Sequence, residues 1–71
     1  MEILRIHTPW IRLDQAMKLL SWVSSGAEAK IRIQEGETKV NGEICLMRGK
    51  KLADGTIIGF QGREARIVVK S

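Results

Sequence analysis

The fold is decided by residues 25–42, which read SGAEAKIRIQEGETKVNG and hold a helix followed by the start of a hairpin. Ser25, with Glu28 three residues later, is a capping-box pattern that typically begins a helix. Gly36 is a common residue just after a helix end, because glycine adopts the left-handed conformation easily. The stretch therefore predicts a helix that begins at Ser25 and stops near Gly36.

From Thr38 the apolar period changes from that of a helix to that of a strand. Two strand-like runs, residues 38–40 and 43–45, flank Asn41-Gly42. An Asn-Gly pair between such runs is the strongest short-range hairpin signal, since both residues tolerate positive φ. Further along, we expect a basic loop at 47–51, a turn at Asp54-Gly55, and strands at 56–60 and 64–69 joined by residues 61–63.

The residues before this stretch predict one more strand and one more helix. Residues 2–6 alternate like a short strand. Apolar residues then recur at helical spacing from Leu13 to Leu20, so we place a helix at about 12–21. Its start stays open, because Thr8 is a good cap and Arg12 a poor one. The predicted architecture is α+β, with two short helices packed on a small, mostly antiparallel sheet.

Size and composition indicate one small basic domain covering residues 1–71. The net charge is +4, from 12 Lys and Arg against 8 Asp and Glu. A basic small domain often meets a polyanion, although many ordinary small proteins are basic too. The single cysteine, Cys45, and the lack of a long apolar stretch lead us to expect a cytoplasmic, soluble monomer away from membranes.

The sequence gives little support to an enzyme or a metalloprotein. His7 is the only histidine, and no serine or cysteine motif stands beside it to be activated. His7 is better explained as a surface residue, and Cys45 as a small core residue within a strand. A metal site needs several Cys or His ligands, and this chain has two in total. We therefore expect no catalytic residue, no metal and no cofactor.

Polar side chains suited to phosphate contact are spread over several predicted elements. Lys30 and Gln34 share one helix face, and Arg48, Lys50 and Lys51 surround Gly49. Arginine and lysine supply charge to phosphate, while amides supply neutral hydrogen bonds. The competing interpretation is a solvated surface in which each charge faces water. The phosphate interpretation requires these residues to gather on one face.

The aromatic residues do not form a platform for reading single strands. Trp22 follows an apolar helix face and is expected in the core, whereas Trp10, beside Thr8-Pro9, is open between core and surface. With one Phe and no Tyr, the chain lacks the aromatic array of single-strand readers. This favours recognition of the backbone and shape of folded RNA over base-by-base reading.

Three segments in order resemble the S4 RNA-binding domain. They are Arg12-Leu13-Asp14, then Ser25 to Lys30, then Val40-Asn41-Gly42. The likeness is strongest to a stand-alone bacterial subgroup, the YbcJ and YaaA type, whose members also carry a basic loop like Arg48 to Leu52. The resemblance covers about residues 11–60 and implies the S4-like (alpha-L) fold.

The resemblance also implies a set of RNA contacts and a cellular role. The implied contacts are Arg12, Ser25, Lys30, Gln34, Lys39, Asn41, Arg48, Lys50 and Lys51. The implied partner is structured RNA, with ribosomal RNA, the ribosome or an assembly intermediate as candidates and large-subunit assembly as the candidate role. Arg32 departs from the family pattern, which is usually apolar here, so it either snorkels or joins the binding face.

Our leading hypothesis from sequence is a non-catalytic module that binds the backbone of structured RNA. The alternative is a protein-interaction module that docks on an acidic or ribosomal protein. A small hydrolase or transferase is a third interpretation with no visible catalytic pair to support it.

Overall fold

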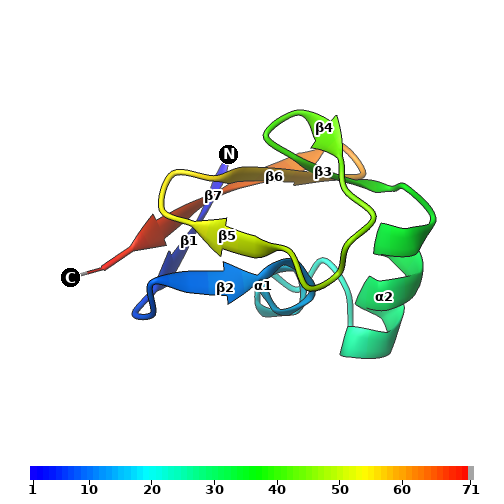
Figure 1. The fold of residues 1–71 in the computed structure, drawn as a ribbon, viewed down its shortest axis with the longest axis horizontal. Coiled ribbons are helices and arrows are strands. Elements are labelled where there is room, and N and C mark those ends of the chain that lie inside the picture. Colours follow the sequence, from blue (N-terminus) through cyan, green and yellow to red (C-terminus); the bar gives the residue numbers. More distant parts are fainter. Residues whose placement is uncertain (71) are drawn as a thin grey trace.

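The computed structural model describes residues 1–70, which form seven strands and two helices (Figure 1). In chain order the elements are β1 (Glu2–Ile6), β2 (Trp10–Arg12), α1 (Leu13–Leu19), α2 (Gly26–Gln34), β3 (Thr38–Val40), β4 (Glu43–Ile44), β5 (Lys51–Ala53), β6 (Ile57–Phe60) and β7 (Arg63–Val69). The expected α+β class and helical pair are confirmed.

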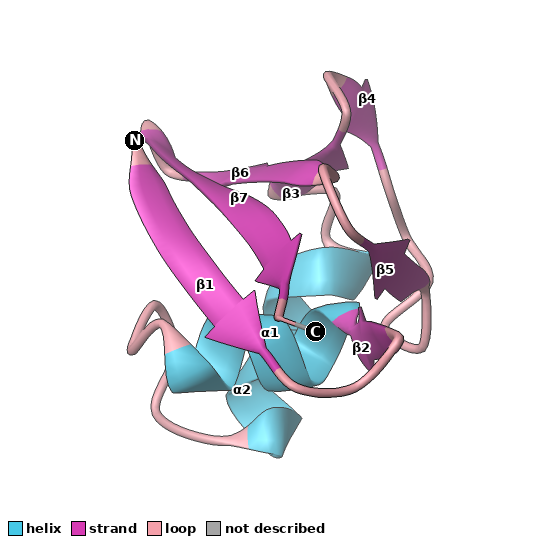
Figure 2. Cartoon of the chain, turned by 90° about the vertical axis from the view of Figure 1, so that its left-hand side faces the viewer, coloured by secondary structure: helices cyan, strands magenta, loops and turns pink. Residues whose placement is uncertain are grey.

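The larger sheet has five strands in the order β1-β7-β6-β3-β4. Its pairs are antiparallel except for β1 and β7, which run parallel with Leu4 opposite Ile67. The first strand of the chain thus lies beside the last one, as Figure 2 shows. The sheet is mostly antiparallel, as the sequence predicts.

A second, two-stranded ladder was not predicted. Strands β2 and β5 pair antiparallel, with Ile11 opposite Leu52 and Arg12 opposite Lys51. Each strand has only three residues, too few for an alternating pattern to stand out from its neighbours. Residues 10–12 are therefore extended, and the first helix runs from Leu13 to Leu19 and not over 12–21.

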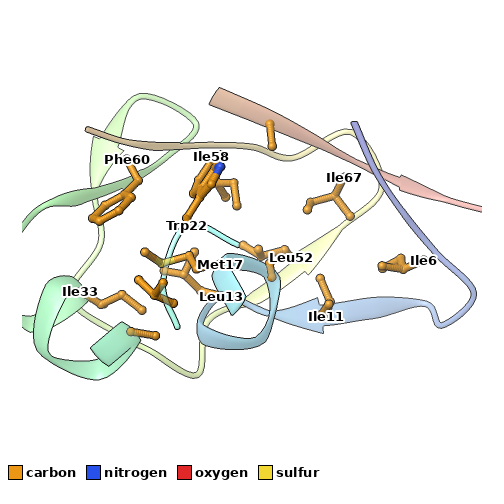
Figure 3. Close-up of a cluster of buried hydrophobic side chains, with 14 residues drawn as sticks. Ile6, Ile11, Leu13, Met17, Trp22, Ile33, Leu52, Ile58, Phe60 and Ile67 are labelled. Carbon is orange, nitrogen blue, oxygen red and sulfur yellow. The ribbon is translucent and has the colours of Figure 1, made fainter. Parts of the chain in front are cut away.

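The core lies between the five-stranded sheet on one side and the two helices and the small ladder on the other (Figures 2 and 3). Leu13 and Met17 of α1 and Ile33 of α2 are fully buried against Ile58 and Ile67 of the sheet. The ladder adds Ile11 and Leu52 to the same cluster. Strand alternation then turns the neighbours of these two residues outward, toward solvent.

The helix start at Ser25 and the Asn41-Gly42 hairpin are confirmed. The Ser25 hydroxyl accepts a hydrogen bond from the Glu28 amide at 3.1 Å. The Glu28 carboxylate reaches back one residue further than a capping box requires, to the amide and hydroxyl of Ser24. Asn41 and Gly42 both have positive φ, at 50° and 85°, as a two-residue hairpin turn needs.

Within residues 1–70, neither helix has the length and apolar character needed to cross a bilayer.

Candidate nucleic-acid interface

The basic loop, residues 48–51, is held against the start of α1 by two backbone hydrogen bonds. The Leu13 amide donates to the Lys50 carbonyl at 2.9 Å, and the Asp14 amide donates to the Arg48 carbonyl at 3.1 Å. The first amides of a helix have no partner within it. Arg12 makes no side-chain cap, so the loop backbone takes the place of one. The loop is therefore fixed in position by the fold.

Arg12 lies beside this loop. It is the ladder partner of Lys51, and a Cβ atom added at Gly49 would lie 3.7 Å from Arg12 Nη2. The guanidinium also forms an ion pair with the nearly buried Asp14 at 3.1 Å, while 43% of the Arg12 side chain stays exposed. Its Nε–H is buried without a partner among the described residues. The structure thus brings Arg12 together with the three basic residues of the loop.

Asn41 and Lys50 meet at a hollow of about 360 Å³ between the β3–β4 hairpin and the loop that follows it. The Asn41 backbone and Oδ1 are both used by the fold, in hydrogen bonds with Ile57. Its Nδ2 has no hydrogen-bond partner among residues 1–70. This amide group is the polar donor that the hairpin offers beside the basic loop.

Large apolar side chains also border this hollow. Ile44, Leu46 and Met47 are 61%, 57% and 66% exposed. Together they form an exposed apolar cluster, which is more informative than apolar residues scattered singly over a surface. Nothing in the sequence pattern marked them, because a short edge strand and a loop have no buried face to reveal.

Ser25, Lys30 and Gln34 lie on α2. Ser25 is half-buried at the cap, where its oxygen already accepts from Glu28. Lys30 and Gln34 are exposed and lie on one flank of the helix, beside the buried Ala29 and Ile33. These residues form a second group, on a different element from the loop.

Lys39 does not join either group. In β3, Thr38 is buried and Val40 packs against the core, so alternation sends Lys39 to the opposite face of the sheet. There it borders a shallow depression that also includes Glu37, Arg63 and Glu64. The expectation of a single patch containing Lys39 is therefore corrected, because strand geometry turns this residue away from the helices.

Two other arginines are neutralised within the fold. Arg63 contacts the Glu2 carboxylate through two hydrogen bonds of 3.0 Å, and Arg32 pairs with Glu37 at 3.3 Å and Glu28 at 3.9 Å. The hydrogen bond from Arg63, followed by that from Trp22, lowers the pKa of Glu2. Arg32 thus pairs with carboxylates of this fold, and these ion pairs accommodate a charged residue where the family pattern is usually apolar.

The pKa of a second carboxyl group, that of Glu28, is also lowered. Hydrogen bonds from the amide and hydroxyl of Ser24 lower this pKa. Both shifted carboxyls are therefore charged structural acceptors and are not proton donors at neutral pH.

The remaining residues singled out from sequence are placed as follows. Trp22 is in the core, stacked on Phe60 with ring centroids 6.1 Å apart, as predicted. His7 is exposed, and Cys45 is a free thiol that packs at the margin of the core. Trp10 is exposed on the small ladder. Within residues 1–70, no three His, Cys, Asp or Glu side chains come close enough to hold a metal ion.

Comparison with known proteins gives the same picture of the fold. Residues 4–68 match the model of a family described as the S4 domain. The chain is 37% identical over 60 residues to the "Putative RNA-binding protein YbcJ" of Escherichia coli, covering 84% of this chain and 86% of that protein. It is 39% identical over 57 residues to the "Probable ribosome maturation protein RlbA" of Bacillus subtilis, covering 80% of each.

A solved structure also superposes on the chain. The solution structure of YbcJ from E. coli aligns with a TM-score of 0.75 and 33% identity, over 97% of this chain and 89% of that one. It is described as revealing an alfaL motif involved in RNA-binding.

Proposed function

The chain belongs to the S4 domain family, and from that premise we propose that it is a non-catalytic protein that binds the backbone of folded RNA. The contacts are Arg12 and the basic loop, with Asn41 beside them. Lys30 and Gln34 of α2 extend the surface, and Ser25 caps that helix. Lys39, on the far face of the sheet, lies outside it.

One observation carries this proposal: four basic residues converge at the start of α1. Arg48, Lys50 and Lys51 have no carboxylate partner among the described residues, and Arg12 keeps an exposed guanidinium edge beside them. Backbone hydrogen bonds hold the loop in place before any ligand arrives. Little ordering entropy is then lost when phosphates bind, which favours affinity.

The chemistry of these side chains suits phosphate. An arginine can present two parallel N–H groups to phosphate oxygens, and a lysine acts as a mobile point charge. The Asn41 amide adds a neutral donor for a ribose or phosphate oxygen. Phosphate and ribose are present in every RNA sequence, so we infer that shape and backbone determine what is bound.

The test is to titrate the protein into a folded, labelled ribosomal RNA fragment and to measure binding by fluorescence anisotropy at several salt concentrations. Neutralising about four phosphates gives a slope of log affinity against log salt of about −3 to −4. No saturable binding at low salt would rule the function out.

We further propose that the RNA is ribosomal and that the role is in ribosome assembly. The support is the likeness to the Bacillus subtilis protein named for ribosome maturation. Crosslinking in cells followed by sequencing of the bound RNA tests it. Enrichment of large-subunit ribosomal RNA is expected, and crosslinks confined to messenger or transfer RNA would overturn it.

A second candidate function is docking on a ribosomal or acidic protein, and the apolar cluster of Ile44, Leu46 and Met47 favours it. Replacing Leu46 and Met47 with Ser should then abolish a pull-down interaction that survives ribonuclease. The triple change of the basic loop to alanine is the matched comparison. An interaction lost on ribonuclease treatment counts against this candidate.

A further inference from the structure

Trp10 is a large aromatic residue that the fold leaves partly exposed. It is 41% exposed, whereas Trp22 is only 7% exposed. In β2 the buried residue is Ile11, so alternation places Trp10 and Arg12 on the same outward face of the ladder. Lys51 and Ala53 of β5 share that face, opposite Arg12 and Trp10. We call this set of residues the ladder face.

On the paired strand β5, the neighbours of Trp10 are a lysine and an alanine. The Lys51 ammonium lies 4.6 Å from the centre of the Trp10 ring, in a cation–π contact. The residue directly across the ladder is Ala53, whose methyl group covers little of the ring. Asp54 follows it, but that carboxylate accepts from the Val69 amide. The ring is therefore accompanied by positive charge and is not enclosed by side chains.

A hydrogen bond and core packing hold the backbone at Trp10 in place. The Trp10 carbonyl accepts a 2.8 Å hydrogen bond from the Thr8 hydroxyl, which fixes the turn before the strand. Ile11 and Leu52 anchor the ladder from beneath, in the core. Because the backbone at Trp10 is fixed in this way, only side-chain torsions lose freedom when a ligand stacks on the ring, unlike an aromatic residue in a loose loop.

We propose that Trp10 stacks on an unpaired base of the RNA whose phosphates lie on Arg12 and the basic loop. The inference rests on the proposed function and adds to it the kind of RNA recognised. The faces of bases inside a duplex are covered by their neighbours, so a single exposed ring can reach only a bulged, looped or terminal base. The preferred ligand is thus a helix with an unpaired nucleotide beside it.

Lys51 connects the two halves of this surface. In the free protein its ammonium lies over the ring, and in the complex it turns toward a phosphate and leaves that ring face to the base. Because the Lys51 ammonium exchanges the Trp10 ring for a phosphate, the binding free energy lost with the cation–π contact is largely recovered. It also explains why an exposed tryptophan is paired with a lysine on the same side of the ladder as Arg12.

The experiment compares two RNA duplexes of the same sequence, one with a single bulged nucleotide and one fully paired. Stacking on an aromatic ring is worth about 5- to 150-fold per base. We expect Trp10→Ala to weaken binding to the bulged duplex at least about fivefold, and to the paired duplex less than about twofold. Trp10→Phe, which keeps an aromatic face, should restore most of the affinity. Equal losses on both duplexes would overturn the proposal.

Intrinsic fluorescence gives a second readout that does not depend on the alanine variant folding. In the wild type the bulged duplex should quench tryptophan emission at the concentrations that raise anisotropy, and in Trp10→Phe the change should disappear. Emission from Trp10 unaffected by a bound bulged duplex would overturn the stacking and leave RNA binding intact. If neither duplex binds the wild-type protein, the proposed function itself is rejected. A ladder face that binds a protein partner instead of RNA would also give no binding of either duplex.

Discussion

Basic residues occur on the ladder side and on the outer face of the five-stranded sheet, but the two regions differ in what surrounds them. Around the basic loop, Arg48, Lys50 and Lys51 have no ion-pair partner among the described residues. On the outer face of the sheet, Arg5, Lys39 and Arg66 also have no ion-pair partner within residues 1–70, but each comes from a different strand, and Glu37 and Glu64 border the same depression as Lys39. The comparison teaches that a count of lysines and arginines does not locate a polyanion site, because the charges must also lie close together, as Arg48, Lys50 and Lys51 do within four consecutive residues.

The largest expected effect comes from the basic loop. Changing Arg48, Lys50 and Lys51 together to alanine removes three cations that have no ion-pair partner among the described residues. We expect RNA affinity at low salt to fall at least about tenfold and the salt slope to become shallower by about 2 to 3. Fluorescence anisotropy with a folded ribosomal RNA fragment measures both quantities.

The matched control is a triple alanine change of Arg5, Lys39 and Arg66. All three are exposed on the outer face of the five-stranded sheet, so the variant loses the same net charge. We expect less than about a threefold loss of affinity, arising from long-range attraction alone. Similar losses in the two variants would show that the regions do not differ in function.

The next largest effect is expected at Asn41, on the hairpin beside the loop. Asn41→Ala places an ordinary side chain at φ 50° and removes the hydrogen bond to the Ile57 amide. The free energy of unfolding should fall by about 1 to 2 kcal/mol in urea denaturation. Asn41→Gly keeps the turn, so a folded glycine variant that binds RNA more weakly assigns the side chain to the ligand. Unchanged affinity would make Asn41 purely structural.

A smaller effect is expected at Ser25, whose oxygen already caps α2. Ser25→Ala should cost about 1 kcal/mol in the free energy of unfolding, since the Glu28 amide loses its acceptor. Thermal unfolding followed by circular dichroism measures this. RNA affinity should change by less than about twofold at a temperature where the variant is folded. A larger loss would show that the Ser25 hydroxyl also touches the RNA.

The smallest effect concerns pH. Hydrogen bonds lower the pKa of Glu2 and Glu28 in the folded protein, so the unfolded state takes up protons first as acid is added. The resulting stability is complete above the ordinary glutamate pKa of about 4.3 and is lost as the pH falls through the lower folded values. Urea midpoints measured from neutral pH downward should decline less steeply in Glu28→Gln. An identical decline in both proteins would contradict the assigned hydrogen bonds.

Local chemistry made α2 and the hairpin predictable. The cap at Ser25 and the Asn41-Gly42 turn depend on neighbours in the chain, which are visible in the sequence. The pairing of β2 with β5 places Ile11 opposite Leu52, about forty residues further along the chain. Strands of three residues are too short for an alternating pattern that would predict this pairing. The fold class was therefore predictable, whereas the small ladder and the true start of α1 were not.

The candidate site, like the fold, was predictable from the sequence only in part. The family resemblance supplied the residue types, and Arg12 lies beside the loop because of a strand pairing that no motif records. Lys39 was grouped with the others by the family resemblance. One position in a strand decides which face a side chain takes, and the sequence near Lys39 is too short to show which face is buried.

The parallel pairing of β1 with β7 has a consequence for synthesis. In the five-stranded sheet, β7 lies between β1 and β6, and it is the last of these five strands to be made. While the chain is being translated, β1 has no hydrogen-bonding partner in the sheet, and its backbone groups stay open to water or to a chaperone. The native sheet is therefore completed only after translation has passed residue Val69, when β7 pairs with β1 and β6.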